Sequence, residues 1–253
     1  MTDGGALDGV RLIVTGASRG LGRAIALACG ARGAIVGLAY HRAEAAARDT
    51  AATLGANAIL LPFDVGDAGA PAAAIRGFVD RTGGLDALVN NAAIVRPSLL
   101  ISAEDTDVDA VLRTNVAGVM ACTRAALEPM LRQRRGVIVN VGSVAAAQPS
   151  RGQAVYAASK GAIEAFTRAV AVEYGRKGVT CVCLSPGPMD TDMFAPTKAL
   201  AGATVLDRTP WTRFVPVDDV AAVAVRLIGG GMSVANGSIV TVDGTAASGE
   251  VAE

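Results

Sequence analysis

Short hydrophobic runs alternate with longer segments of helical periodicity along the whole chain. Most of the short runs are continuous in Val, Ile and Leu, which is typical of parallel strands covered on both faces. We predict strands over Val10–Thr15, Ala34–Ala39, Ala58–Phe63, Leu85–Asn90, Gly136–Val141, Val179–Leu184 and Ser238–Val242. We predict helices over Leu21–Arg32, Ala43–Leu54, Ala68–Arg81, Asp107–Arg134, Gly152–Arg176 and Val217–Ile228.

This alternation predicts an α/β fold with a doubly wound, Rossmann-type, seven-stranded parallel sheet and helices on both faces. No linker or change of composition divides the chain, so we expect residues 1–253 to form a single domain. We expect residues 1–8 and 245–253 to be flexible, because they carry no strand or helix pattern. Residues 186–216 are too long for an ordinary connection and follow a strand, which predicts a substrate loop or lid.

Composition narrows the possible functions. Hydrophobic residues make up 51% and charged residues 18% of the 253 residues, so the chain has material for a large core. Its 23 basic and 23 acidic residues cancel, which argues against a nucleic-acid partner. A single His and four scattered Cys offer no zinc ligand set, so we expect no metal. The chain shows no signal-peptide pattern and no apolar run long enough for a membrane span, which favours a soluble, cytoplasmic protein.

A glycine-rich turn joins the first predicted strand to the first predicted helix. It reads Thr15-Gly16-Ala17-Ser18-Arg19-Gly20-Leu21-Gly22. Glycines allow a tight turn and close backbone approach, and the free N–H groups of the following helix N-terminus favour a bound pyrophosphate. Its position within a βαβ unit makes a nucleotide-binding turn the better interpretation than a purely structural one.

The spacing T-G-x-x-x-G-x-G resembles that of the short-chain dehydrogenase/reductase family, and further motifs occur in the order of that family. They are Asp64-Val65, Asn90-Asn91-Ala92, Asn115, Ser143, Tyr156-x-x-x-Lys160 and Pro186-Gly187. The resemblance covers residues 10–244. Within the family, the TGASRGLG turn and Asp190-Thr191-Asp192-Met193 are most similar to the 3-oxoacyl-[acyl-carrier-protein] reductases.

The end of the second strand indicates which nicotinamide coenzyme would bind. An NAD enzyme usually carries an acidic residue there, but Tyr40, His41 and Arg42 follow without one. Arg42 and Arg19 would attract a 2′-phosphate, which favours NADP(H). We expect His41 at the adenosine end. The resemblance implies the other coenzyme-binding residues: Gly16, Ser18, Gly20, Leu21, Gly22, Asp64, Val65, Asn91, Ala92, Tyr156, Lys160, Pro186, Gly187, Met189 and Thr191.

Tyr156 and Lys160 are four residues apart, so on a helix both can reach one site. We expect the ammonium to lower the tyrosine pKa, which fits Tyr156 for proton donation. Ser143, after the fifth strand, can hold the substrate oxygen. The resemblance adds Asn115 as the anchor of a water in a proton relay. These residues predict NADPH-dependent reduction of a β-keto group, in particular of a 3-oxoacyl thioester bound to a carrier protein or coenzyme A.

Two other functions stay open. One is an oxidoreductase of a free secondary alcohol or ketone, such as a sugar, steroid or polyketide. The other, of a different class, is a non-catalytic nucleotide-sensing protein on the same fold. The chain also departs from the family pattern: Ala93 and Thr245 stand where glycines are usual, and we expect the Ala93 methyl to narrow the nicotinamide side.

Basic residues end the two longest predicted helices. Cations stabilise helix C-termini, which explains them structurally. The resemblance implies a second interpretation, in which Arg134 and Lys177 dock an acyl carrier protein. It also implies that these two helices form the subunit interface of a homotetramer, with a dimer as the alternative.

Overall fold

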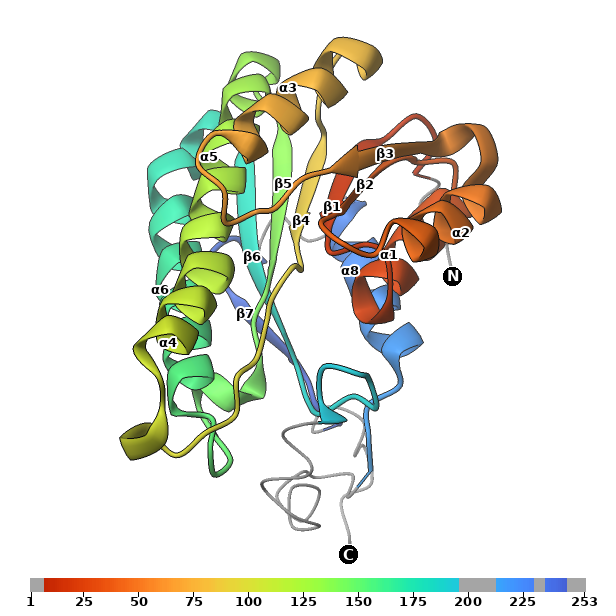
Figure 1. Ribbon diagram of the computed structural model, residues 1–253. Coiled ribbons are helices and arrows are strands. Elements are labelled where there is room, and N and C mark those ends of the chain that lie inside the picture. The colour runs from red at the N-terminus through yellow and green to blue at the C-terminus, as the bar shows by residue number, and fades with distance from the viewer. Residues whose placement is uncertain (1–6, 196–212, 230–234, 245–253) are drawn as a thin grey trace, which may run out of the picture.

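A computed structural model describes residues 7–195, 213–229 and 235–244. Its sheet has seven strands, all parallel, in the order β3-β2-β1-β4-β5-β6-β7. The predicted doubly wound parallel fold is therefore confirmed (Figure 1). The strands are β1 (Arg11–Thr15), β2 (Ile35–Tyr40), β3 (Ala58–Pro62), β4 (Ala87–Asn90), β5 (Gly136–Val141), β6 (Val179–Pro186) and β7 (Ile239–Val242).

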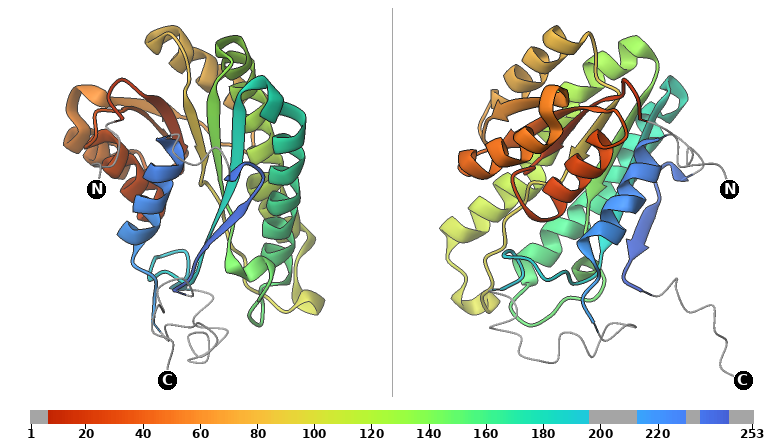
Figure 2. Two further views of the ribbon diagram at one scale, coloured as in Figure 1. Left: turned by 180° about the vertical axis from the view of Figure 1, so that it is seen from behind. Right: turned by 90° about the vertical axis from the view of Figure 1, so that its right-hand side faces the viewer.

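Helices cover both faces of this sheet, with α1, α2 and α8 on one side and α3, α4, α5 and α6 on the other (Figures 1 and 2). They are α1 (Gly20–Gly30), α2 (Glu44–Leu54), α3 (Ala70–Thr82), α4 (Asp105–Leu112), α5 (Gly118–Gln133), α6 (Ala154–Tyr174) and α8 (Val217–Ile228). Short 3₁₀ turns span Gly55–Asn57, Leu100–Ser102, Val144–Ala146 and Gly175–Lys177.

Two hydrophobic cores explain why the strands are apolar throughout. Successive side chains of a strand point to opposite faces. Leu12 and Val14 therefore pack into the core beneath α1 and α8, whereas Ile13 packs into the core beneath α3 and α5. All three side chains are fully buried, so a polar residue at either face would be costly.

The predicted helix Asp107–Arg134 is interrupted. The structure has α4, then a π-helical turn over Arg113–Ala117, then α5. A π turn adds one residue to a helical turn without changing its hydrophobic character, so periodicity does not reveal it. Such turns are frequent at functional sites, and this one carries Asn115.

The predicted flexible ends and loop lie largely outside the described residues, which omit 1–6, 196–212 and 245–253. Leu7, inside the predicted flexible N-terminus, is only 1% exposed and belongs to the core. The predicted flexibility therefore does not hold for Leu7.

An ion pair joins the amino ends of β1 and β4. Arg11 donates to both carboxylate oxygens of Asp86, at 2.7 and 2.9 Å, and Arg135 lies 2.9 Å from the same carboxylate. Burial would raise the pKa of Asp86, but the hydrogen bonds from Arg11 outweigh burial and hold this pKa below its usual range. Asp86 is 15% exposed, so solvent screens the pair only partly.

We expect Asp86→Asn to lower the free energy of unfolding by about 2 kcal/mol at neutral pH. A carboxylate whose pKa is depressed by folding stabilises the protein above its unfolded pKa, near ~3.9. This contribution disappears as the pH falls through the lower pKa of the folded state. Urea unfolding of both proteins between pH 7 and pH 3 should therefore show curves that converge in acid. A constant difference across that range would contradict the assignment. Glu44→Gln, which breaks the exposed pair with Arg48, should change little.

Candidate active site

A cavity of about 750 Å³ opens at the carboxyl ends of the strands, where open α/β sheets bind ligands. All predicted site residues line it except Gly22 and Asn115. They are Gly16, Ser18, Arg19, Gly20, Leu21, His41, Arg42, Asp64, Val65, Asn91, Ala92, Ser143, Tyr156, Lys160, Pro186, Gly187, Met189 and Thr191.

The backbone of the glycine-rich turn favours glycine at its key positions. Gly16 and Gly20 have φ angles of +66° and +53°, in the left-handed region that favours glycine. Gly22 lies beneath the turn instead of on the cavity wall. A Cβ atom there would come within 2.3 Å of the Gly16 carbonyl oxygen, so the first turn of α1 packs directly on the loop backbone.

Asn91, which follows the neighbouring strand β4, stabilises this turn through hydrogen bonds to Thr15 and Gly16. The backbone N–H of Asn91 donates to Thr15 Oγ1 at 2.9 Å, and Asn91 Nδ2 donates to the Thr15 carbonyl at 2.9 Å. Asn91 Nδ2 also lies 3.2 Å from the Gly16 carbonyl oxygen. The Asn91 amide therefore holds the turn as well as facing the cavity.

The N-terminus of α1 suits an anion. Arg19 precedes it in extended conformation, no side chain caps it, and its first turn contains no acidic residue. Its first N–H groups and the helix dipole thus favour a negative group at the turn.

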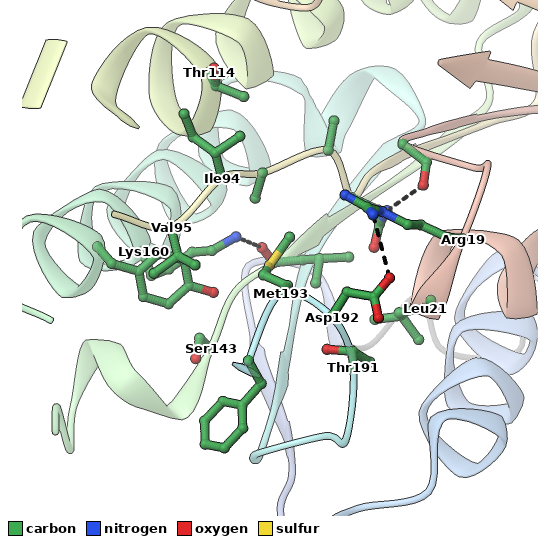
Figure 3. A pocket seen from close by; sticks show the side chains of 18 of the residues that line it. Arg19, Leu21, Ile94, Val95, Thr114, Ser143, Lys160, Thr191, Asp192 and Met193 are labelled. Atoms are coloured by element: carbon green, nitrogen blue, oxygen red, sulfur yellow. Dashed lines mark hydrogen bonds and ion pairs between the residues drawn. The ribbon is translucent and has the colours of Figure 1, made fainter. Parts of the chain in front are cut away.

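The end of β2 carries His41 and Arg42 and no acidic residue. Arg42 lines the cavity, and His41 Nδ1 lies 3.2 Å from Asp64 Oδ2. The other Asp64 oxygen accepts from the Gly66 N–H at 2.9 Å. Arg19, in the glycine-rich turn, forms an exposed ion pair with Asp192 at 3.4 Å (Figure 3). The turn and the two arginines fit a nucleotide with an additional phosphate.

Ser143, Tyr156 and Lys160 meet at the other end of the cavity. Lys160 is 4% exposed, donates to the Val141 carbonyl at 2.7 Å, and lies 5.6 Å from the centre of the Tyr156 ring. Burial lowers the pKa of Lys160 to about 8, so at neutral pH it is still mainly protonated.

The expectation that Lys160 lowers the tyrosine pKa is wrong for this structure. Burial raises the pKa of Tyr156 to about 12, and the hydrogen bond with Ser143 only partly opposes this. The ammonium is directed to the Val141 carbonyl instead of the phenol oxygen, so its effect on the phenol does not offset the loss of water.

Asn115 is buried behind the cavity wall. Its Oδ1 accepts from the Ile94 N–H at 2.8 Å, and its Nδ2 donates to the Ile94 carbonyl at 2.9 Å and to Ser159 Oγ at 3.1 Å. Ser159 Oγ in turn donates to the Tyr156 carbonyl at 2.6 Å. The amide thus connects the segment after β4 to the turn of α6 that carries Tyr156.

Sequence reasoning missed several lining residues at this end, among them Ile94, Val95, Gln148, Gln153, Met193 and Phe194. Ile94 and Val95 follow a strand end, which was the available signal. Ala93 also lines the cavity. Thr245 lies outside the described residues.

Arg134 and Lys177 lie far from this site along the strands. They immediately precede β5 and β6, at the amino ends, whereas Ser143 and Gly187 follow the carboxyl ends of the same strands. The Lys177 ammonium lies 5.1 Å from the Tyr174 ring centre.

Comparison with known proteins decides the family. The short chain dehydrogenase family model matches residues 11–200. The chain belongs to the short-chain dehydrogenase family. A 3-oxoacyl-[acyl-carrier-protein] reductase from Synechocystis is 38% identical over 83% of this chain and 85% of the relative. One from Pseudomonas aeruginosa is 35% identical over 94% of this chain and 97% of the relative.

Two solved structures extend this likeness to short-chain dehydrogenases with bound coenzyme. A short chain dehydrogenase from Burkholderia cenocepacia, in complex with NADP, has a TM-score of 0.87 and 34% identity over 96% of this chain and 99% of its own. A gluconate 5-dehydrogenase from the same organism, with NADP and tartrate, has a TM-score of 0.89 and 32% identity over 98% and 99%.

Within the described residues of this short-chain dehydrogenase, no helix is long and apolar enough to cross a membrane. The same residues contain no cluster of three or more His, Cys, Asp or Glu that could hold a metal ion.

Proposed function

We propose that this protein reduces the β-keto group of a 3-oxoacyl thioester, bound to a carrier protein or to coenzyme A, with NADPH as reductant. One observation carries the proposal: a single cavity joins a phosphate-binding turn at one end to Ser143, Tyr156 and Lys160 at the other. The naming of its 35–38% identical relatives as 3-oxoacyl-[acyl-carrier-protein] reductases supports the substrate class.

The residues present fit NADP(H). Gly16 and the α1 N-terminus would hold the pyrophosphate, Arg19 and Arg42 the 2′-phosphate, and His41, Asp64 and Val65 the adenosine end. When bound, the coenzyme supplies the hydride. The NADP in two similar structures supports this assignment.

The side chains of this protein would manage the oxygen and its proton. Ser143 would hold the keto oxygen through its hydroxyl, while Tyr156 donates the proton that this oxygen gains. A phenol with a pKa of about 12 carries its proton at neutral pH but is a weaker acid than an unperturbed tyrosine, so efficient donation depends on groups that stabilise the phenolate. Lys160 would then stabilise the phenolate, and Asn115 would keep the Tyr156 turn in place, besides anchoring the water of a proton relay.

The test is coenzyme oxidation against a panel: acetoacetyl thioester, a carrier-bound 3-oxoacyl chain, cyclic ketones and sugars. We expect the highest kcat/KM for the thioesters and a preference for NADPH over NADH. A preference for NADH would contradict the roles of Arg19 and Arg42. Failure to reduce any thioester would overturn the substrate class, and failure with every compound would favour the nucleotide-sensing alternative.

Oxidoreduction of a polyol or other free alcohol is the second candidate. Its support is the gluconate 5-dehydrogenase among the similar structures, together with the polar lining residues Gln148, Ser150 and Gln153. NADP-dependent oxidation of gluconate, without reduction of thioesters, would establish it.

We further propose docking of an acyl carrier protein at Arg134 and Lys177, in a cytoplasmic homotetramer. Exposed Leu112, Met120 and Val172 on α4, α5 and α6 support an interface between copies. Reversing both charges should raise KM for a carrier-bound substrate and leave that of a small thioester unchanged. Equal effects on both substrates would argue against docking, and light scattering tests the tetramer.

A further inference from the structure

Two phenylalanines meet where the chain leaves β6 and returns to the sheet before α8. The rings of Phe194 and Phe214 are 5.6 Å apart at 78°, an edge-to-face contact. Close by, the Val215 N–H donates to the Pro188 carbonyl at 2.9 Å. The Gly187 N–H donates to the Val242 carbonyl at the same distance, which ties this point to the end of β7.

This junction is tightly packed. A Cβ atom on Gly187 would lie 3.1 Å from both Val215 Cγ2 and the Asp243 Cα atom. The Phe194 N–H donates to the Thr191 carbonyl at 2.9 Å, and the Phe194 ring is supported from one side by Phe214. Edge-to-face pairs of this kind stabilise a ring orientation beyond the burial of apolar area.

Only one of the two rings reaches the cavity. Phe194 lines it together with Ser143 and Tyr156, whereas Phe214 is absent from the described cavity wall. Phe214 therefore touches Phe194 without lining the described cavity, so it can act on a substrate by positioning Phe194.

Phe194 belongs to an apolar wall at the end of the cavity that Ser143, Tyr156 and Lys160 line. Val95 and Met193 are drawn above Ser143 in Figure 3, and Val144, next to Ser143 in the sequence, also lines the cavity. Their side chains offer no hydrogen-bond partner. A substrate with hydroxyl groups next to its keto carbon would lose hydrogen bonds to water there, whereas an alkyl chain would gain from burial.

We propose that Phe214 is a positioning residue for substrate specificity, which holds Phe194 against the alkyl chain beyond the keto group. The proposal rests on the proposed function and sharpens its substrate class. Medium and long 3-oxoacyl thioesters are preferred over acetoacetyl thioester, and apolar ketones over polyhydroxylated ones.

The experiment compares 3-oxodecanoyl- and 3-oxobutanoyl-N-acetylcysteamine as substrates of the wild type and of Phe214→Ala. We expect the variant to raise KM for the long thioester roughly ten-fold. The KM for the short thioester, the KM for NADPH and both kcat values should stay within about two-fold. Phe214→Tyr keeps the ring and should restore the wild-type KM, whereas Phe214→Leu, of similar size but without the ring, should restore it only partly.

Two failures can be told apart. If the wild type reduces neither thioester, the proposed function is wrong, and the same variants are then measured with 2-butanone and 2-decanone. An equal change in KM for the short and long member of either pair would overturn the specificity role of Phe214. So would an unchanged KM for the long substrate in Phe214→Ala. A fall in kcat for both substrates at unchanged KM would assign Phe214 to the fold instead.

Discussion

Tyr156→Phe should lower kcat for ketone reduction by about 10²–10⁴-fold, the usual contribution of a general acid. The substitution removes only the Tyr156 hydroxyl. This hydroxyl is protonated at neutral pH and interacts with Ser143, which would hold the keto oxygen. The half-buried ring keeps its packing and its position 5.6 Å from Lys160. Steady-state NADPH oxidation with a 3-oxoacyl thioester measures the effect.

Two controls make this result specific. The melting temperature should stay close to the wild-type value, because the hydroxyl supports neither the sheet nor the glycine-rich turn, and the Kd for NADPH, measured by fluorescence, separates a loss of proton donation from a loss of coenzyme binding. Tyr174→Phe is the matched variant: it removes a phenol hydroxyl from the far end of α6 and should leave kcat unchanged. A Tyr156→Phe enzyme with near-normal kcat would refute the assignment of the proton donor.

The strands could be predicted because each is buried on both faces, which requires an almost purely apolar sequence. The position of the site could be predicted for a related reason. Ser143, Asn91 and Gly187 each follow the carboxyl end of a strand, and in a parallel sheet these ends share one edge.

Features that depend on three-dimensional contact stayed hidden. The tyrosine pKa depends on how much water the folded cavity leaves around the phenol, and no spacing of residues reports that. The bond between Arg11 and Asp86 spans 75 positions, and the contact of Phe194 with Phe214 joins residues from the two ends of a long connection. The resemblance placed Asn115 with Lys160 and Tyr156 in a proton relay, which stays a prediction, and the side-chain bonds of Asn115 to Ile94 and Ser159 join segments that no sequence pattern connects.

Gly22→Ala should destabilise the fold and weaken coenzyme binding together. The backbone of Gly22 is ordinary helix, so alanine is acceptable there except for its methyl group. That methyl would lie 2.3 Å from the Gly16 carbonyl oxygen and 2.5 Å from Asn91 Nδ2. Backbone cannot rotate away as a flexible side chain could, so either the turn shifts from α1 or Asn91 loses its bond to Thr15. We expect a loss of about 1–3 kcal/mol in unfolding free energy.

The same displacement moves the N–H groups that would bind the pyrophosphate, so the Kd for NADPH should rise at least about ten-fold, since a loss of ~1.4 kcal/mol in binding is one decade. Gly77→Ala is the matched control. Gly77 lies in α3, and no atom lies within 4 Å of the place that an alanine Cβ would occupy, so alanine there should stabilise the helix by about 0.5–1 kcal/mol. Calorimetry and NADPH titration of both variants separate the two effects.

If Gly22→Ala kept wild-type stability and affinity, the contact between α1 and the turn would not be what shapes the phosphate site. If the variant lost affinity for NADPH but kept the wild-type free energy of unfolding, the turn would have moved without any loss of packing in the sheet.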